Sequence, residues 1–358
     1  MMNLIVQTPD EILANLPKPR LEHVTRCVLA SDDWLILCAG FEDRALAVLQ
    51  NTAASGEAFN VLLITYEPFV PQNKADTVRD ICRRGGVNLV ELAYNRQNPV
   101  GFGRVLVEKL SGEQGRIVVD VSGMSRLLIV QVLVALSRTT KGFFNCSVAF
   151  VQAQEYLPTR PEAEAELARS ESDPTFSVLF LSSGVFEITV LPELSSFAPA
   201  AAQTRLICFP SIDAHHLIAL RAEIQPSRLT FIEGVPPGPQ NQWRQRMVSA
   251  VNRLDQIRQA EVFQTSTLDY LETLDCLLKL YAAHAVSERL LIAPTGSKMQ
   301  SVAVGIFRSF IEDVHIVYPT PRGYCSPDNY TRGVGQMYML SLEPYCKPAG
   351  EFPLDPEP

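Results

Sequence analysis

The chain has 358 residues, of which 47% are hydrophobic and 20% charged, so it is long enough for two domains and too apolar for wholesale disorder. Its formal net charge of −8 at pH 7 argues against a protein that coats duplex DNA or anionic lipid through bulk charge, while a local basic pocket for a small anion is compatible with it. The eight cysteines include no CxxC pair, no apolar run reaches the ~18 residues of a membrane span and no secretory leader is recognisable, so we expect a cytoplasmic protein with reduced thiols and no membrane partner.

Short β-rich runs alternate with helical patterns in the first half, which is typical of βαβ units and a parallel sheet. The predicted strands are 34–39, 60–66, 88–93, 116–121 and 147–152. Helices include 76–84 and 105–110. The segment 161–172 is either an exposed helix or a mobile connection, and the runs 175–181 and 185–191, separated by Ser-Ser-Gly, indicate an antiparallel hairpin that closes the sheet.

The same alternation restarts in the second half. Strands are predicted at 205–209, 228–232, 261–265, 289–293, 314–318 and 336–342, and helices at 214–223, 242–258, 270–285 and 299–311. Residues 192–203 are rich in Pro, Ser and Ala and are interpreted as a linker. We therefore expect an N-terminal Rossmann-like domain at 1–191, a C-terminal one at 204–346 and a flexible, proline-rich tail at 347–358.

Several local features recur at a nearly constant spacing between the two halves. Cys38 and Cys208 each end a first strand, 170 residues apart, and Pro-Gln-Asn at 71–73 returns at 239–241. Ser122-Gly123 returns as Thr295-Gly296, and residues 156–160 (Tyr-Leu-Pro-Thr-Arg) are echoed by 318–322 (Tyr-Pro-Thr-Pro-Arg). Because these matches keep their order and follow corresponding strands, they favour an internal duplication and predict a pseudo-two-fold protein with two equivalent crevices.

The loop Pro-Thr-Gly-Ser-Lys-Met at 294–299 carries the clearest chemical signal. In an open parallel sheet, ligands bind beyond the carboxyl ends of the strands. Gly296 allows close backbone approach, the helix start that follows supplies free N–H groups, and Thr295, Ser297 and Lys298 add hydroxyls and a cation. This combination suits a phosphate or a ribose. The alternative is an ordinary strand-to-helix turn with Thr or Ser as the N-cap.

The loops after the first and fourth strands of the first half are the other candidates. Their chemistry-bearing residues are Gly40, Glu42, Arg44, Asp120, Ser122, Gly123, Ser125 and Arg126. Asp120 ends a central strand, where a carboxylate is costly to bury unless it is paired, so it is either a structural partner of Arg126, Arg44 or its own loop amides, or a contact for a ligand. Arg44 points either to solvent or toward the crevice of Arg126.

Other kinds of site are not supported by spacing. Gly296 and Lys298 are not adjacent, so the loop is no P-loop, and Met124 occupies the third ligand position of a DxSxS metal loop. No metal and no cofactor is therefore predicted. His215 and His216 open a helix without a metal-binding partner, leaving a structural role or a part in phosphate contact or acid–base chemistry. No nucleophile elbow, zinc-protease motif or dinucleotide fingerprint is present, and no catalytic residue is assigned.

The segment 318–335 is long for a structureless loop and mixes aromatic rings with guanidinium groups. Such a mixture suits base stacking and phosphate contact. We expect a lid or rim over the second crevice, with Arg322 and Arg332 as its binding residues.

The two glycine loops resemble those of the CRISPR-associated Rossmann fold (CARF) family. Residues 294–299 are similar to the second motif of that family, and 122–126 (Ser-Gly-Met-Ser-Arg) are a looser version of it. Family members bind cyclic oligoadenylates or related second messengers across a two-fold dimer interface and usually carry an effector domain. The resemblance implies two CARF-like copies in one chain, and because no such appendage is recognisable, it implies an output through a separate protein partner.

The sequence thus predicts an α/β protein of two Rossmann-like domains arranged as an internal pseudo-dimer. It would sense a phosphate-rich second messenger of the cyclic oligonucleotide type in antiphage defence, and bind it in the cleft between the two domains, at the Gly123 and Gly296 loops. Phosphates would meet Lys298, Arg126 and Arg44. The hydroxyls of Thr295, Ser297, Ser122 and Ser125 would donate hydrogen bonds, and Asp120 would recognise a ribose hydroxyl or base amine. The alternatives are a metal-independent ring nuclease that cleaves the messenger and a non-catalytic interaction subunit. The ligand's identity and any homo-oligomerisation stay open.

Overall fold

The computed structural model describes residues 7–172, 182, 184–196, 203–257, 259–323 and 330–346. The predicted strand 175–181 and the predicted tail 347–358 lie outside them. Within the described residues, no helix has the length and apolar character needed to cross a membrane. The cysteines in this part of the chain are all free thiols.

The first sheet has seven strands in the order β1-β15-β6-β5-β2-β3-β4. Their bounds are β1 Glu22–Val24, β2 Trp34–Cys38, β3 Asn60–Glu67, β4 Asn88–Asn95, β5 Ile117–Asp120, β6 Cys146–Val151 and β15 Met337–Ser341. The five strands from β6 to β4 are parallel, whereas β15 is antiparallel to β6, and β1 to β15. Every residue of the central strand β2 is buried, as expected where helices cover both faces of a parallel sheet.

The second sheet has six strands in the order β11-β10-β9-β12-β13-β8. Their bounds are β8 Val185–Val190, β9 Gln203–Cys208, β10 Arg228–Val235, β11 Ala260–Ser266, β12 Glu288–Ala293 and β13 His315–Pro321. Five of these strands are parallel and β8 is antiparallel to β13. The order of the two sheets corresponds strand for strand from β6 to β4 and from β13 to β11. The chain is therefore an α/β protein with two Rossmann-like, mostly parallel sheets.

Each sheet includes one strand from the other half of the sequence. Strand β8 pairs with β13 in the second sheet, so the prediction that residues 185–191 close the first sheet was wrong. Strand β15, from the end of the described chain, pairs with β6 in the first sheet. The sheets therefore do not follow the predicted division of the sequence at 192–203. The run of alternating residues indicated a strand correctly, but an isolated strand pattern carries no information about its pairing partner.

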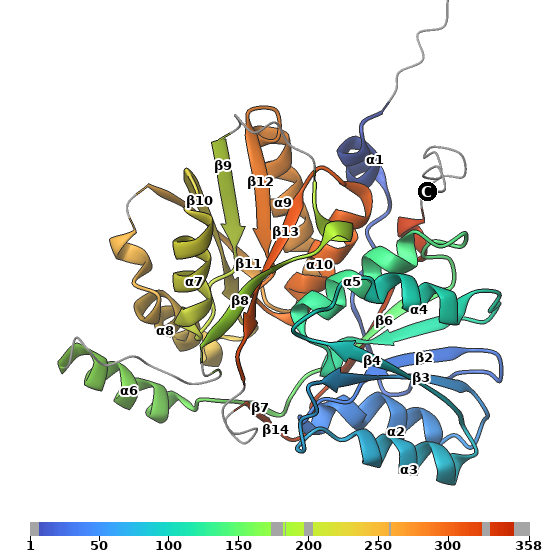
Figure 1. Ribbon diagram of the computed structural model, residues 1–358. Coiled ribbons are helices and arrows are strands. Elements are labelled where there is room, and N and C mark those ends of the chain that lie inside the picture. The colour runs from blue at the N-terminus through green and yellow to red at the C-terminus, as the bar shows by residue number, and fades with distance from the viewer. Residues whose placement is uncertain are drawn as a thin grey trace, which may run out of the picture.

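Helices form an inner layer between the two sheets and two outer layers (Figure 1). The inner helices are α4 Phe102–Leu110, α5 Arg126–Ser137, α9 Tyr270–His284 and α10 Lys298–Phe310. On the outer faces lie α2 Ala47–Ala53 and α3 Ala75–Gly85 for the first sheet, and α7 Ala214–Ile224 and α8 Trp243–Val251 for the second. Two further helices, α1 Pro9–Asn15 and α6 Arg160–Ser172, lie near α9 and α8 respectively. Residues 161–172, predicted to be either an exposed helix or a mobile connection, are thus helical.

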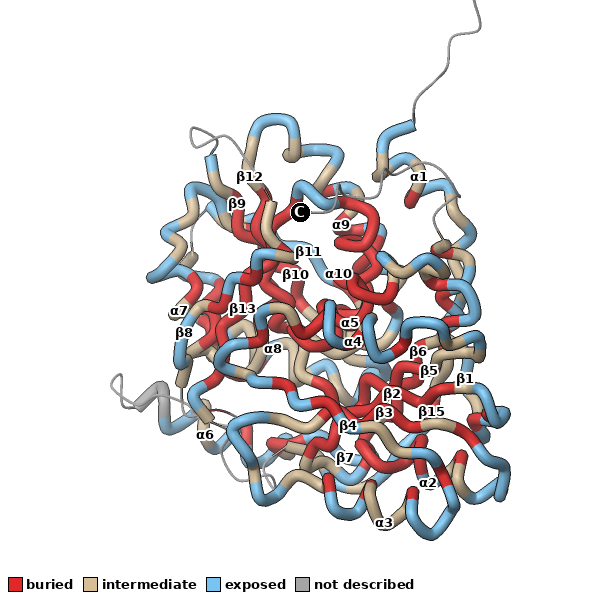
Figure 2. The backbone as a smooth tube through the Cα atoms, turned by 45° about the vertical axis from the view of Figure 1, so that its right-hand side comes forward, coloured by how far each residue is buried: buried red, intermediate tan, exposed pale blue. Residues whose placement is uncertain are grey.

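One hydrophobic core joins both halves of the molecule. It includes apolar side chains of both sheets together with those of α5 and α10, which pack against each other. Both helices are almost entirely buried, as the red tubes at the centre of Figure 2 show. At their crossing, a Cβ atom placed on Gly305 would lie 2.8 Å from Leu133 Cδ1, so the absence of a side chain there permits the close approach.

Candidate functional site

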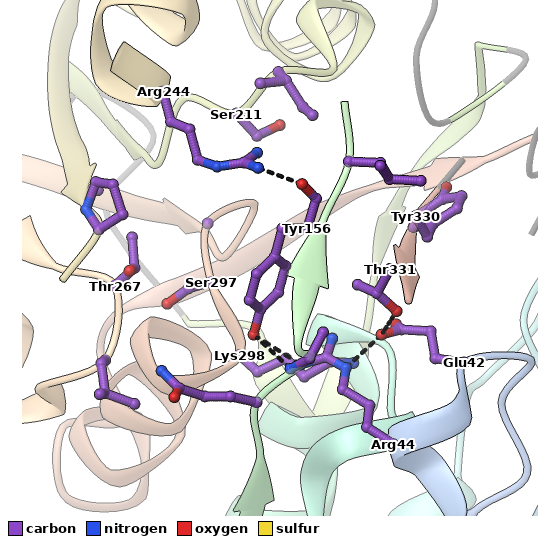
Figure 3. A pocket seen from close by; sticks show the side chains of 18 of the residues that line it. Glu42, Arg44, Tyr156, Ser211, Arg244, Thr267, Ser297, Lys298, Tyr330 and Thr331 are labelled. Atoms are coloured by element: carbon purple, nitrogen blue, oxygen red, sulfur yellow. Dashed lines mark hydrogen bonds and ion pairs between the residues drawn. The ribbon is translucent and has the colours of Figure 1, made fainter. Parts of the chain in front are cut away.

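The carboxyl ends of the parallel strands in both sheets face one shared cavity of about 930 Å³. Loops from the first sheet contribute Gly40, Glu42, Arg44, Asn73, Arg96 and the stretch 123–126, among others. Loops from the second contribute Ser211, Asn241, Thr267 and 296–298, among others. The loops that were predicted to bind a ligand follow these strands, and in the described residues loops of both halves line the same cavity (Figure 3). The two crevices expected from the duplication are thus one shared space.

The two glycine loops meet in this cavity and bind each other reciprocally. Lys298 Nζ donates a hydrogen bond of 2.7 Å to the carbonyl oxygen of Met124. Arg126 Nε donates in turn to the carbonyl oxygen of Gly296. Both donors lie 172 residues apart in the sequence, and so do both acceptors. A cation from each half thus reaches across to the backbone of the other half.

Glycine is required in both loops because the chain packs closely there. A Cβ atom on Gly123 would lie 2.2 Å from the carbonyl oxygen of Cys38. On Gly296 it would lie 2.2 Å from Gln300 Oε1 and 2.8 Å from Phe209 Cβ. Neither position tolerates a side chain without displacement of its neighbours. This close packing fixes the shape of both loops.

Ser125 and Ser297 are the N-caps of α5 and α10. The capping alternative for the loop 294–299 is therefore correct for Ser297, and Ser125 has the same role, which was not predicted. Ser125 Oγ accepts from Leu128 N, and Ser297 Oγ accepts from Gln300 N at 3.1 Å, in a capping box with the Gln300 side chain. The same two serines line the cavity. The starts of α5 and α10, where the helix dipoles are positive, therefore lie at the cavity, which favours an anion there.

Glu42 and Arg44 form an ion pair at the first-sheet side of the cavity. Glu42 Oε2 accepts from Arg44 Nε and, at 3.1 Å, from Thr331 Oγ1. Arg44 Nη1 also donates to the carbonyl oxygen of Val151. Burial alone would favour the protonated acid, but Arg44 and Lys298 outweigh it and lower the pKa of Glu42 to about 2. Glu42 is therefore ionised, and Arg44 lines the cavity instead of pointing to solvent.

Lys298 is the cation at the centre of the site. Burial, together with the nearby charges of Arg44 and Arg126, lowers the pKa of its ammonium group to about 7, while Glu42 opposes this effect. The side chain thus gains or loses a proton in the neutral range. An incoming anion would stabilise its charged form.

Three of the predicted residues lie behind the cavity wall. Asp120 is 1% exposed, and its carboxylate accepts a hydrogen bond from Ser122 N. Of the predicted partners, it therefore binds the amide of its own loop. Burial raises the pKa of its carboxyl to about 6. Ser122 Oγ accepts from Val151 N at 2.9 Å. Thr295 Oγ1 donates to the carbonyl oxygen of Phe209 at 2.7 Å. These contacts hold the loops in shape, and none of the three residues lines the cavity.

The segment 318–335 contributes to the cavity through residues other than the two arginines predicted. Tyr318, Tyr330 and Thr331 line it. Arg332 is exposed and pairs with Glu155 at 3.5 Å, and the backbone amide of Arg322 binds the carbonyl oxygen of Gly184. Residues 324–329 lie outside the described chain.

A two-stranded ribbon, β7 Glu155–Tyr156 and β14 Thr331–Arg332, crosses the cavity. The Tyr156 side chain projects toward its centre, and its hydroxyl accepts from Arg44 Nη1 at 3.3 Å (Figure 3). On the opposite side, Arg244 Nη2 donates to the carbonyl oxygens of Tyr156 and Pro158, and the Arg244 guanidinium lies 4.4 Å from the centre of the Trp243 ring. The ribbon is thereby tied to both halves.

Tyr156, Trp243 and Arg244 line the cavity and were not predicted from the sequence. Tyr156 belongs to one of the repeated segments, which was the available signal for it. Trp243 and Arg244 lie on α8, where nothing in the local pattern distinguishes them from other surface residues. His215 and His216 do not line the cavity; burial lowers the pKa of His216 to about 4. Within the described residues, no group of three or more His, Cys, Asp and Glu side chains is arranged to hold a metal.

No protein-family model and no curated protein matches this chain. Among solved structures, the cytoplasmic domain of a prokaryotic cation chloride cotransporter is similar at 10% identity, over 79% of this chain and 93% of that one, with a TM-score of 0.24. Phosphoethanolamine N-methyltransferase 1 of Haemonchus contortus is similar at 8% identity, over 80% of this chain and 72% of that one, with a TM-score of 0.20. Likenesses this distant carry no argument about function, which has to come from the site.

Proposed function

We propose that this protein is a cytoplasmic sensor that binds a phosphate-rich nucleotide second messenger, of the cyclic oligonucleotide type, between two CARF-like halves. The observation that carries the proposal is the meeting of the Gly123 and Gly296 loops in one cavity, each with a cation directed across it. Through a separate protein partner, binding would serve antiphage defence. This last step rests on the resemblance of the loops alone.

A pseudo-two-fold relation between the halves supports the internal pseudo-dimer. Residues 172 positions apart meet at the centre of the molecule: Arg126 and Lys298 exchange reciprocal contacts, and Leu133 packs on Gly305. Strands β8 and β15 are each paired in the sheet of the other half. Contacts of this kind are typical of an isologous dimer interface, here joined in one chain.

The chemistry of the cavity suits phosphate groups near its centre. Lys298 and Arg126 now direct their donors at carbonyl oxygens, which a phosphate oxygen would replace as a stronger, charge-assisted acceptor. The capped starts of α5 and α10 add backbone dipoles of the same sign. Aromatic rings of Phe150, Tyr156 and Tyr330 line the same space and offer faces for bases.

The proposal is tested by calorimetric titration of the protein with cyclic and linear oligoadenylates of two to four nucleotides. We expect one of them to bind at micromolar affinity or better, and Lys298→Ala and Arg126→Ala each to weaken it at least tenfold, because a charge-assisted contact is lost. Arg104→Gln, a change at an exposed residue of α4 distant from the cavity, serves as the matched control. Unchanged affinities in both cavity variants, or no binding of any probe, would overturn the proposal.

A ring nuclease is the second candidate, and Lys298 is the observation that favours it. A group with a pKa of about 7 beside a bound phosphate can transfer a proton during cleavage without a metal. Incubation of the messenger that binds with the protein in EDTA, followed by chromatography, separates the two activities. Linear products formed by the wild type but not by Lys298→Ala would establish that the protein cleaves the messenger. Binding without linear products would show that it is a sensor.

A further inference from the structure

We propose that Glu42 is a specificity-determining residue that accepts a hydrogen bond from the amino edge of one base of the ligand, and that the other half of the cavity makes no such contact. Only one base of the ligand would then be recognised through its amino group, although the two halves that form the site are similar. This inference rests on the proposed function and adds the group that is recognised. It also replaces Asp120, which lies behind the cavity wall, as the acceptor for a base.

The Glu42 carboxylate has one occupied oxygen and one available oxygen. Oε2 accepts from Arg44 Nε and Thr331 Oγ1. Oε1 accepts no hydrogen bond from any residue in the described ranges, although the side chain as a whole is only 13% exposed and lines the cavity. Arg44 and Thr331 hold the carboxylate in one orientation (Figure 3). A held, ionised acceptor in a confined space favours a ligand donor and repels a phosphate.

The surroundings of Glu42 are suited to a base more than to a sugar. The rings of its neighbours Phe41 and Tyr330 lie 5.0 Å apart at their centres, in an edge-to-face arrangement. The Arg44 guanidinium lies 5.7 Å from the centre of the Phe150 ring and 5.5 Å from that of Tyr156. Aromatic and guanidinium planes of this kind stack on nucleobases. The glycine loops, where phosphates and sugars would bind, lie at the α5 and α10 starts instead.

The equivalent position in the second half cannot make the same contact. Glu42 lies four residues after Cys38, which ends β2, and Ile212 lies four residues after Cys208, which ends β9. Both residues line the cavity. The aliphatic Ile212 has no acceptor on its side chain, so the position equivalent to Glu42 offers an amino group no ionised acceptor. The correspondence between the two halves also holds elsewhere in the cavity lining. Asn73 and Asn241, from the repeated Pro-Gln-Asn segments, both line the cavity.

The test uses cyclic oligoadenylates of two to four nucleotides and analogues in which purine, lacking the amino group, replaces all adenines or all but one. For the ring size that binds best, we expect the ring with one adenine to bind within about threefold of the all-adenine ring. The all-purine ring should bind at least tenfold more weakly, because the hydrogen bond to an ionised acceptor is lost. In Glu42→Gln, which keeps the size of the side chain, this discrimination should fall to about threefold or less.

A gain-of-function variant completes the test. Ile212→Glu introduces a second acceptor at the equivalent position and should make the ring with one adenine bind more weakly than the all-adenine ring. Thermal unfolding of each variant checks that it is folded. If wild-type protein binds the all-purine ring as tightly as the all-adenine ring, or if Glu42→Gln retains full discrimination, this inference is wrong while the proposed function stands. If no ring binds, both fail.

Discussion

Lys298 is the residue on which the pH behaviour of the site depends. Its pKa of about 7 arises because burial and the charges of Arg44 and Arg126 disfavour the ammonium form more than Glu42 favours it. The free protein therefore carries a mostly neutral amine above pH 8 and a mostly charged one at pH 6.5. A bound phosphodiester remains ionised throughout this range and stabilises the charged form, so binding takes up a proton.

We therefore predict that the affinity for an oligonucleotide falls about tenfold between pH 7 and pH 8.5. Lys298→Arg, whose side chain stays charged, should bind with little change over the same range. Titration calorimetry in two buffers of different ionisation enthalpy measures the proton uptake directly. The titrations are made above pH 6.5 because the pKa of the Asp120 carboxyl is raised to about 6, and protonation of this group would add a second pH effect at lower pH. An affinity independent of pH in the wild type would contradict the assignment of Lys298 to the phosphate.

The sequence indicated the site residues that follow from local geometry. Gly123, Gly296, Ser125 and Ser297 were predictable because a strand, a glycine and a capped helix start have a recognisable order along the chain. The depth of a side chain was not predictable. Asp120 and Thr295 belong to the same loops but point behind the cavity wall, where Ser122 N and the carbonyl oxygen of Phe209 occupy them. Only the packing of β5 and β12 between their neighbours decides this.

At the scale of elements, the contact between α5 and α10 fixes the distance between the two glycine loops, since each helix begins at one of them. Gly305 sets this distance because the Leu133 side chain fills the place of its missing Cβ, with Cδ1 only 2.8 Å from the position that a Cβ would take. An added methyl group here overpacks a buried helix–helix contact.

We predict that Gly305→Ala lowers the free energy of unfolding by about 1–3 kcal/mol, the usual effect of overpacking, even though alanine is the better helix former. The same strain should move the Lys298 and Met124 loops apart and weaken ligand binding. Chemical denaturation measures the stability, with Lys109→Ala, at an exposed position of α4, as the control. A Gly305→Ala protein as stable as the wild type would show that the helices can separate freely.

The core strands and helices were largely predictable because their hydrophobic runs and periodicity are local properties. The predicted strand 34–39 corresponds to β2 and the predicted helix 299–311 to α10, each within one residue at its ends. The pairing of β8 and β15 was not predictable, since either sheet offers a suitable edge and residues more than 100 positions away decide the choice. The ribbon of β7 and β14 was missed because each strand has only two residues.

At the scale of the whole molecule, the exchange of β8 and β15 couples the stability of the two sheets. If the other half of the sequence is removed, the second sheet loses its edge strand β8, and the first sheet loses β15, which joins β1 to β6. The shared core also loses one of its two central helices. A fragment of either half alone exposes an unpaired strand edge and a large apolar face.

We predict that a protease site inserted between residues 196 and 203, once cleaved, leaves the two fragments associated. They should co-elute in size-exclusion chromatography at the position of the uncut protein and keep most of its thermal stability, because β8 and β15 stay paired across the cut. Each fragment expressed alone should aggregate or remain unfolded. Fragments that separate and fold independently would contradict the coupling of the two sheets.

The same interlocking restricts how a molecule as large as a nucleotide ring can enter. Separation of the two halves would break the pairing of β8 with β13 and of β15 with β6. It would also expose the buried surfaces of α5 and α10. The free energy required is comparable to the stability of the whole fold. The ribbon of β7 and β14 has only two residues in each strand and is held by single side-chain contacts, among them those of Tyr156 with Arg44 and Arg244 and that of Thr331 with Glu42, so less has to be broken to displace it. Under the proposed function, a ligand would therefore enter the cavity past this ribbon, and the contacts of Arg44 and Arg244 with Tyr156 would slow its release.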